Sequence, residues 1–316
     1  MAAPAVTPGP AAPDSAGPDA AAAIRYHYDV GNEFYQLWLD RSLTYSCAMP
    51  ASPADTLEDA QQRKLRYHLD AVGADGPLEH GVLDIGCGWG SLLRELSRPG
   101  GASAGRPPVG LTLSDAQAAF IRSQGYPGAE VRTENWTSYQ PVRRFDGIVS
   151  IGAFEHFARP GDDPAAKVRV YREFFGRCRD WLTPGGALSL QAIAYANMSP
   201  GDASRFMQRE VFPDADLPTL AEIAAAAEGT FEICSLRNDR LDYAWTCEQW
   251  ARRLRANRAA ALRLAGPETV ARYQRYLKMS ALGFLMGKIC LLRLVLRPYQ
   301  GGYLGGGYRV GRAGAR

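Results

Sequence analysis

The chain has 316 residues, of which 46% are hydrophobic and 22% are charged, a composition typical of a soluble globular protein with a sizeable core. The formal net charge is only +3 and no run of Lys or Arg stands out, so the sequence lacks the signature of a nucleic-acid-binding protein. Six cysteines are scattered without paired spacings or partnering histidines, which argues against a metal site or a disulfide framework and favours reduced thiols in the cytoplasm.

The N-terminal region divides into two parts. Residues 1–20 are almost entirely Ala, Pro, Gly and Asp, with no basic stretch and no apolar core, so we expect a disordered leader and no signal peptide. The remainder, 21–316, is expected to form a single domain that opens with a helical lid over 21–75. Helices are predicted at 22–39 and 57–72, the second capped by Thr56 with Asp59 three residues on.

Strands and helices then alternate through 80–195. Strands are predicted at 82–85, 109–113, 130–132, 147–151 and 187–192. Helices are predicted at 91–96, 115–124 and 168–182, the last of them halted by Pro184, Gly185 and Gly186. This alternation predicts a doubly wound, Rossmann-like α/β sheet whose 80–195 core binds a cofactor.

The C-terminal part of the chain departs from this alternation. We expect a mostly helical insertion at 196–230, which together with the N-terminal helices is a candidate lid. The part 231–316 is expected to complete the fold, with a strand at 231–236, helices through 246–296 and a final strand near 303–310. Within the helical part, the long apolar run 279–296 contains Lys288 and Arg293, so it predicts a core helix, or an interfacial helix in peripheral contact with a membrane, and no transmembrane span.

A glycine-rich turn indicates the cofactor. Asp84, Gly86, Gly88 and Gly90 stand at alternate positions between a predicted strand and a predicted helix. Glycines let the backbone approach a ligand, and the helix N-terminus offers free N–H groups. The spacing differs from the dinucleotide-binding pattern, and the next strand ends in Gly-Leu-Thr-Leu-Ser (110–114) without an acid for a ribose diol. Both features favour S-adenosylmethionine over NAD.

Several ordered segments then resemble one family, the cyclopropane-fatty-acid synthases, which include the mycolic acid cyclopropane synthases. The segments are Tyr-His-Tyr-Asp-Val-Gly-Asn (26–32), Leu-Thr-Tyr-Ser-Cys-Ala (43–48), 82–90, 110–114 with Gln117, Ile-Val-Ser-Ile-Gly-Ala-Phe-Glu-His-Phe (148–157), and Phe212-Pro213-Asp214 with Leu217-Pro218. The resemblance covers roughly residues 22–296 and implies an S-adenosylmethionine-dependent methyltransferase.

The resemblance also implies which residues hold the cofactor. Those expected to bind S-adenosylmethionine are Tyr45, Ser46, Asp84, Gly86, Gly88, Thr112, Leu113, Gln117, Asn135, Trp136 and Ile151. Without the resemblance, Trp136 and Ile151 would be read as core residues, because apolar residues near strand ends are usually buried for packing alone.

The reaction centre of the family holds a bicarbonate ion that serves as a base. Carried over to this chain, the resemblance places Cys47, Glu155, Ile193 and Tyr243 around it, with Gln191 where the family has a histidine. A glutamine donates hydrogen bonds but cannot become cationic. Four interpretations stay open. Bicarbonate binds more weakly, Glu155 acts as the base itself, or the acceptor needs no deprotonation by the enzyme. A neutral exchange at residue 191 is the fourth.

Aromatic residues in the expected lid favour a hydrophobic small-molecule or carrier-bound acyl acceptor. Our first hypothesis is a C-methyltransferase acting on an alkene carbon through a carbocation, with or without cyclopropane closure, in lipid or natural-product biosynthesis. A true cyclopropane synthase on unsaturated fatty acyl chains and an N-methyltransferase of a small amine are the alternatives. A non-catalytic S-adenosylmethionine-binding protein is disfavoured by the retained Cys47, Glu155 and Tyr243.

Overall fold

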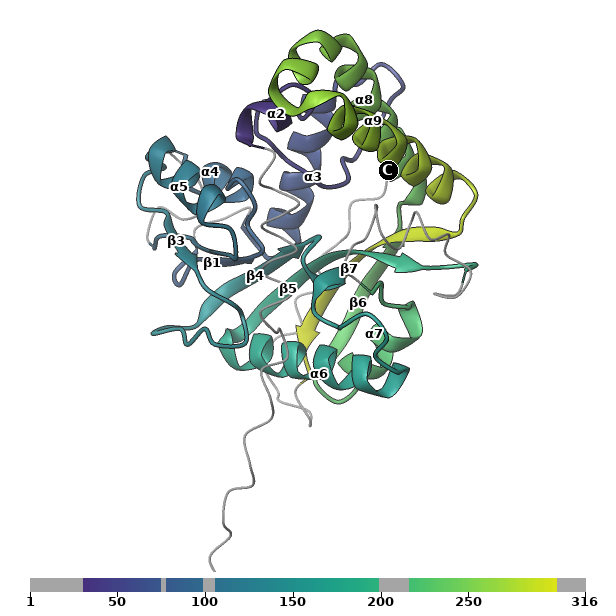
Figure 1. Ribbon diagram of the computed structural model, residues 1–316. Helices are drawn as coiled ribbons and strands as arrows, with labels where there is room; N and C mark the ends of the chain where they lie inside the picture. Colours follow the sequence, from purple (N-terminus) through teal and green to yellow (C-terminus); the bar gives the residue numbers. More distant parts are fainter. Residues whose placement is uncertain (1–30, 75–77, 99–105, 199–215, 300–316) are drawn as a thin grey trace, which may run out of the picture.

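A seven-stranded sheet forms the centre of the computed structural model, which describes residues 31–74, 78–98, 106–198 and 216–299 (Figure 1). The strands are β1 (Val82–Ile85), β2 (Val109–Thr112), β3 (Glu130–Thr133), β4 (Phe145–Ile151), β5 (Leu182–Tyr195), β6 (Phe231–Asn238) and β7 (Ile289–Pro298). Their order is β3-β2-β1-β4-β5-β7-β6. Strands β1 to β5 are parallel, and β7 runs antiparallel to β5 and β6. This arrangement confirms the predicted doubly wound α/β class.

The helices cover both faces of the sheet. They are α2 (Asn32–Gln36), α3 (Leu57–Ala71), α4 (Ser91–Leu96), α5 (Asp115–Gln124), α6 (Pro164–Trp181), α7 (Leu220–Ala227), α8 (Arg240–Ala256), α9 (Arg258–Leu285) and the 3-10 helix η1 (Phe154–His156). In Figure 1, α2, α3, α8 and α9 lie on one side of the sheet and α6 and α7 on the other. Helices α4 and α5 and strand β1 have the predicted bounds, because their signals are local: the glycine turn before α4 and Ser114, which caps α5.

The position of β1 determines where a ligand can bind. Strand β2 lies on one side of β1 and β4 on the other, so successive crossovers leave β1 in opposite directions. In doubly wound folds, this reversal opens a crevice at the carboxyl ends of the strands. All four residues of β1 are buried, and so are all four of β2, which fixes the two strand ends rigidly beneath the crevice.

Three predicted elements differ from the structure. Of the helix expected at 22–39, the structure shows α2, which covers five residues, and the part before residue 31 lies outside the described residues. Residues 199–215 of the predicted insertion also lie outside the described residues. The described part of that insertion, α7, packs against α6 on the side opposite the lid helices, so it does not belong to the lid (Figure 1). The strand predicted at 187–192 also begins earlier: α6 ends at Trp181, one residue before its predicted end, and β5 begins at Leu182 and includes Pro184, Gly185 and Gly186.

The largest correction concerns the apolar run 279–296, which was predicted to be a helix. Helix α9 ends at Leu285, Gly287 follows with a φ of 66°, and residues 289–298 form β7 in the interior of the sheet. A continuous apolar run fits a buried helix and a buried strand equally well, and only the pairing of β7 with β5 and β6 decides between them. The strand expected near 303–310 lies outside the described residues.

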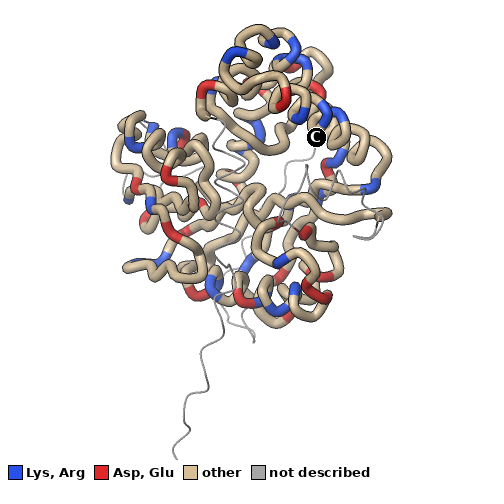
Figure 2. Tube along the Cα trace, viewed as in Figure 1, with Lys and Arg blue, Asp and Glu red and all other residues tan. Residues whose placement is uncertain are grey.

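Charges and helix lengths agree with the composition. Figure 2 shows Lys and Arg interspersed with Asp and Glu around the outside of the tube, with no face that carries one sign alone in this view. None of the helices within the described ranges has the length and apolar character needed to cross a bilayer.

Candidate active site

A cavity lies at the carboxyl ends of β1, β2 and β4, between the sheet and α3. All eleven residues predicted to hold the cofactor line it: Tyr45, Ser46, Asp84, Gly86, Gly88, Thr112, Leu113, Gln117, Asn135, Trp136 and Ile151. The fold therefore brings together side chains from the loop before α3 and from four strand ends. Their contact with a cofactor stays a prediction, but their convergence on one cavity is a structural result.

The floor of the cavity is the glycine turn after β1. Gly86 and Gly88 have φ angles of 81° and 56°, which residues with a side chain rarely adopt. A Cβ atom on Gly86 would lie 2.5 Å from the Cβ atom of Ala153, so only glycine fits there. At Gly88 no atom lies within 4 Å of such a Cβ atom. The backbone at Gly88 therefore faces open space, into which a ligand can approach closely.

The end of β2 presents neutral polar groups. The hydroxyl of Thr112 donates to Oε1 of Gln117 at 2.7 Å, and the backbone N–H of Ser114 donates to the same hydroxyl at 3.1 Å. Both side chains are buried, so their orientation is fixed. With its Oε1 atom occupied, Gln117 keeps its amide N–H groups for a ligand. An acid does line the cavity nearby, namely Glu134, which directly follows β3 and was missed from the sequence.

Lys64 and Asp84 are buried charged residues that also line the cavity. Lys64, on α3, is 1% exposed, and its Nζ atom donates to Oγ of Ser46 at 2.9 Å. Burial lowers the pKa of Lys64 to about 7. Burial likewise raises the pKa of Asp84 to about 7, although the charge of Lys64 opposes that rise. Both groups therefore change their charge near neutral pH, beside the predicted methionine end of the cofactor.

Helix α3 also fixes the loop that carries Tyr45 and Ser46. Gln61 donates from Nε2 to the carbonyl oxygens of Ser46 at 2.8 Å and Thr44 at 3.2 Å. The capping box predicted at Thr56 and Asp59 is present and begins α3 at a defined residue. The register of α3 therefore decides which side chains reach the cavity.

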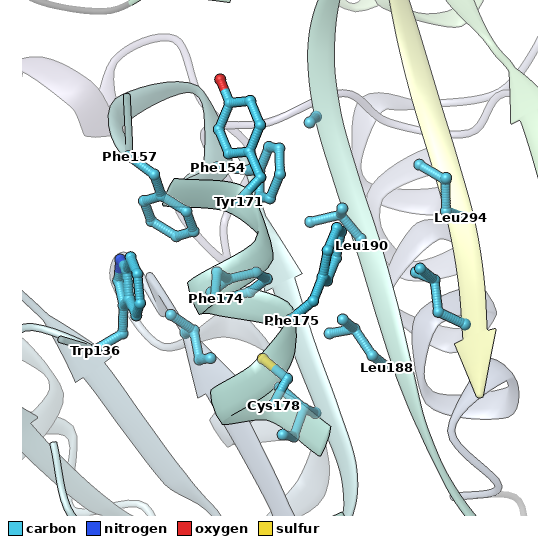
Figure 3. Packing of buried hydrophobic residues seen from close by; sticks show 14 of the residues in the cluster. Trp136, Phe154, Phe157, Tyr171, Phe174, Phe175, Cys178, Leu188, Leu190 and Leu294 are labelled. Carbon is cyan, nitrogen blue, oxygen red and sulfur yellow. The ribbon is translucent and has the colours of Figure 1, made fainter. Parts of the chain in front are cut away.

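Glu155 is held at the end of β4 by an aromatic cluster. Phe154 of η1 and Phe157, the residue after η1, pack against α6, where Phe154 stacks on Tyr171 with ring centroids 4.3 Å apart (Figure 3). Trp136 joins this cluster, with its ring centroid 5.1 Å from that of Phe157, so it is a core residue that also reaches the cavity.

The carboxyl group of Glu155 is buried and only half paired. Its Oε1 atom accepts a hydrogen bond from the backbone N–H of Ile193 at 2.6 Å. Its Oε2 atom is buried and has no hydrogen-bond partner among the described residues. Burial raises the pKa of Glu155 to about 7, and the Ile193 N–H opposes that shift. A carboxyl group with one fixed oxygen and one free oxygen, titrating near neutrality, is suited to accept a proton.

Cys47 and Tyr243 are two further residues that the resemblance places at the reaction centre. Tyr243 is within electrostatic range of Cys47 and of Glu155, and its pKa is raised, mainly by burial. Burial raises the pKa of Cys47 to about 12, so its sulfur is a thiol and not a nucleophile. Tyr243 stacks on Phe284 of α9 with ring centroids 4.5 Å apart.

Gln191 is tied to two side chains that sequence reasoning missed. Its Oε1 atom accepts a hydrogen bond from Nε of Arg293 at 2.9 Å and lies 3.4 Å from Nε2 of His68. The other ring nitrogen of His68, Nδ1, lies 2.8 Å from Oγ of Ser189. The pKa of His68 is lowered, mainly by burial and then by the charge of Lys64, so its imidazole is neutral.

The missed residues do leave a signal in the sequence. Gln61, Lys64 and His68 stand four, seven and eleven residues after Leu57, on the buried face of an amphipathic helix. Polar side chains on such a face require buried partners, which marks them as candidates for a site. Arg293 likewise interrupts an otherwise apolar run, Ile-Cys-Leu-Leu-Arg-Leu-Val-Leu (289–296).

The fold, the glycine turn and the polar strand ends together define a class I S-adenosylmethionine-dependent methyltransferase. The family model "Mycolic acid cyclopropane synthetase" matches residues 17–294, and the chain belongs to this family. Cyclopropane mycolic acid synthase 2 of Mycobacterium tuberculosis is 35% identical over 275 residues, covering 81% of this chain and 87% of the relative. A "Probable fatty acid methyltransferase" of Pseudomonas putida is 33% identical, covering 90% of this chain and 71% of the relative.

Solved structures agree with this assignment. The cyclopropane synthase MmaA2 from Mycobacterium tuberculosis superposes with a TM-score of 0.76 at 30% identity, covering 88% of this chain and 98% of that chain. The mycolic acid cyclopropane synthase CmaA1, solved in complex with SAH and CTAB, gives the same TM-score at 29% identity and the same coverage. Coclaurine N-methyltransferase, at 19% identity and a TM-score of 0.70, shares the fold alone.

Proposed function

We propose that this protein transfers the methyl group of S-adenosylmethionine to an alkene carbon of a hydrophobic, lipid-like acceptor. The observation that carries the proposal is the buried Glu155 carboxyl group, with one oxygen fixed by Ile193 and the other unpaired. Methylation of an alkene leaves a carbocation, which must lose a proton to a base. Methylation of an amine forms no carbocation and needs no base of this kind. The names of the relatives, cyclopropane mycolic acid synthase and fatty acid methyltransferase, agree with an acceptor of this kind.

The cavity fits the cofactor chemically. Gly88 leaves open space above the turn, Gln117 keeps donors for a ribose, and Lys64 and Ser46 are suited to the charged methionine end. When bound, S-adenosylmethionine supplies an activated methyl group, whose transfer to an alkene carbon leaves S-adenosylhomocysteine and a carbocation in the acceptor. The protein contributes positioning and the exclusion of water.

Aromatic side chains of the lid pack around Tyr45 and Tyr243, two residues that we assign to the site. Tyr45 and Trp250 have ring centroids 5.2 Å apart, and the ring of Tyr243 lies 6.1 Å from that of Trp250 and 4.5 Å from that of Phe284. Aromatic faces stabilise positive charge without reacting with it. The same surface provides the apolar wall that an acyl or isoprenoid chain needs.

Proton removal from the methylated acceptor completes the reaction in our proposal. Loss of the proton from the new methyl group closes a cyclopropane ring or forms a methylene group, and loss from a neighbouring carbon shifts the double bond. Glu155 is the proton acceptor that the chain itself provides. A positioned base of this kind contributes about 10²–10⁴-fold to the step that it assists.

We also propose that a bicarbonate ion binds beside Glu155. The Nε2 atom of Gln191 and the hydroxyl of Tyr243 make no hydrogen bonds within the described part of the chain, and the Oε2 atom of Glu155 lacks a donor. Two donors and one acceptor match the oxygens and the hydroxyl group of bicarbonate. Gln191, Tyr243 and Glu155 would hold the ion, which would supply a second base at this centre.

The experiment that tests this function uses S-adenosylmethionine with a CD3 group. The purified protein is incubated with separate pools of unsaturated acyl species, isoprenoid diphosphates and small amines, and products are identified by accurate mass. An alkene product that keeps two deuterons shows cyclopropane or methylene formation, and one that keeps three shows methylation with proton loss elsewhere. Reaction of the amine pool alone would contradict the proposal.

A further inference from the structure

We propose that Arg293 is a positioning residue that holds Gln191 as a hydrogen-bond donor toward the reaction centre. The inference rests on the proposed function, because Gln191 matters only if a base or an anion acts beside Glu155. It accounts for the glutamine that replaces the histidine of the family. In this chain, we infer, the charge that a histidine can carry is provided by an arginine on the neighbouring strand.

Arg293 faces Gln191 directly across the sheet. The two residues are register partners between β7 and β5, and Arg293 is 0% exposed. A guanidinium group so deeply buried is costly unless each of its N–H groups finds an acceptor. Its Nε atom donates to Oε1 of Gln191 at 2.9 Å. This single contact determines how the amide of Gln191 is turned.

An amide held in this way cannot flip. Turning it over would place its NH2 group against the N–H of Arg293, so that two donors would face each other in a buried site. His68 agrees with this orientation in the tautomer that carries its proton on Nε2, because that nitrogen lies 3.4 Å from Oε1. The Nε2 group of Gln191 is therefore fixed as the side that remains free to donate, which is the polarity that a carboxylate or bicarbonate requires.

The other nitrogens of Arg293 connect this amide to the lid. Nη2 donates to the carbonyl oxygen of Ala48 at 3.0 Å and lies 3.4 Å from both the carbonyl oxygen and the sulfur of Cys47. Nη1 pairs with Asp239 and lies 3.6 Å from Asp242, the residue before Tyr243. One cation thus contacts Gln191 and Cys47, two of the five residues expected at the reaction centre, and reaches Asp242 on the helix that carries Tyr243.

The two carboxylates beside Arg293 do not simply cancel its charge. Burial would raise the pKa of Asp239, but Arg237 and Arg293 lower it, so this carboxyl group is ionised. Burial and the neighbouring charge of Asp239 raise the pKa of Asp242 to about 6. Asp239 also pairs with Arg237, so its charge is shared between two arginines. Two arginines therefore face these two carboxylates: Nη1 of Arg293 is directed at the acids, and its Nε atom contacts Gln191.

The test is a double-mutant cycle with Gln191→Glu and Arg293→Lys. Gln191→Glu has the same shape and still accepts from Arg293, but it replaces the free donor by an acceptor, so we expect kcat to fall about 100-fold. Arg293→Lys keeps a charge without the Nε donor, and we expect a loss of about 10-fold or more. Because Arg293 acts through Gln191, the double variant should lose little more than Gln191→Glu alone.

Other readouts separate positioning from mere stability. The Kd for S-adenosylhomocysteine and the melting temperature of Gln191→Glu should stay near those of the wild type. Arg297→Lys, on the same strand with an exposed side chain that donates to the carbonyl oxygen of Gly185, is the matched control and should keep full activity. The side-chain amide signals of Gln191, assigned by their absence in Gln191→Glu, should shift in Arg293→Lys and not in Arg297→Lys.

The outcomes are distinguishable. Additive losses in the cycle or unshifted amide signals would overturn the positioning role. A Gln191→Glu variant with near wild-type kcat would overturn it even if Arg293→Lys failed to fold. A wild-type protein that methylates no alkene would instead count against the proposed function, while the amide signals would still report on the contact between Arg293 and Gln191.

Discussion

The Nζ atom of Lys64 lies 2.9 Å from the Oγ atom of Ser46, and both side chains line the cavity that we assign to the cofactor. This contact crosses from α3 to the loop of the lid. It places a buried ammonium group where the resemblance expects the methionine end of S-adenosylmethionine. Lys64 therefore provides a direct test of how the cofactor is oriented.

We predict that Lys64→Met weakens the binding of S-adenosylhomocysteine by about 10–100-fold, because a charge-assisted hydrogen bond in a buried site is worth about 1.5–3 kcal/mol. Since burial lowers the pKa of Lys64 to about 7, wild-type affinity should decrease as the pH rises through neutrality, and the variant should lose this dependence. Isothermal titration at pH 6 and pH 8 measures both effects. Lys278→Met, at an exposed position of α9, is the control and should bind like the wild type. If Lys64→Met bound S-adenosylhomocysteine as tightly as the wild type, the methionine end would lie elsewhere.

Glu155→Gln should lower kcat by about 100-fold or more, while the Kd for S-adenosylhomocysteine changes little. The amide keeps the shape and can still accept from the Ile193 N–H, but it cannot take a proton. Loss of cofactor binding in this variant would show that Glu155 belongs to the cofactor site and not to the reaction centre.

The pH dependence of kcat follows from the same group. Because burial raises the pKa of Glu155 to about 7, the carboxyl group is protonated and inactive as a base below that value. We therefore expect kcat, at saturating cofactor, to rise about 10-fold per pH unit below pH 7 and to level off above it. A flat profile between pH 5.5 and pH 9 would exclude Glu155 as the base.

Bicarbonate should stimulate the wild-type enzyme after dissolved carbon dioxide has been removed. The free donors of Gln191 and Tyr243 and the unpaired Oε2 of Glu155 are the groups that would bind it. The rate should recover with added bicarbonate in a saturable way. Formate, a carboxylate anion that lacks the hydroxyl group of bicarbonate, is the control anion. Unchanged rates would leave Glu155 as the base that acts alone.

The glycine turn offers a test of the fold that is independent of the chemistry. Gly86→Ala should lower the free energy of unfolding by about 2–4 kcal/mol, because its Cβ atom would lie 2.5 Å from the Cβ atom of Ala153 at a positive φ angle. Gly176→Ala, within α6 and facing open space, should be neutral or stabilising by up to about 1 kcal/mol. Urea unfolding of the two variants measures the difference.

Much of the cofactor site could be predicted from the sequence because its signals are local. Asp84 lies in β1 and Gly86 and Gly88 follow it, while Thr112 ends β2 and Gln117 lies in the first turn of α5, so their convergence on one cavity follows from a parallel sheet. The parts that could not be predicted depend on contacts between distant segments. His68 meets Ser189 across 121 positions of the chain, and no spacing reveals such a pair.

Gln191 shows the same limit more sharply. From the sequence, this glutamine was a departure from the family without an explanation. The structure supplies the partner, Arg293, 102 positions later and on a segment that was predicted to be helical. Because the prediction of a helix hid the strand pairing, it also hid the cation.

The place of β7 has a consequence for how the protein is made. Residues 289–298 fill the gap between β5 and β6, so a growing chain that has already produced β6 still holds two strands with unpaired edges. Open edges of this kind invite pairing with other chains. The glycine turn and the parallel strands can assemble earlier during synthesis, whereas Arg293 reaches Gln191 only when this last strand is inserted. During biosynthesis, the cavity assigned to the cofactor can therefore form before the centre where the acceptor reacts.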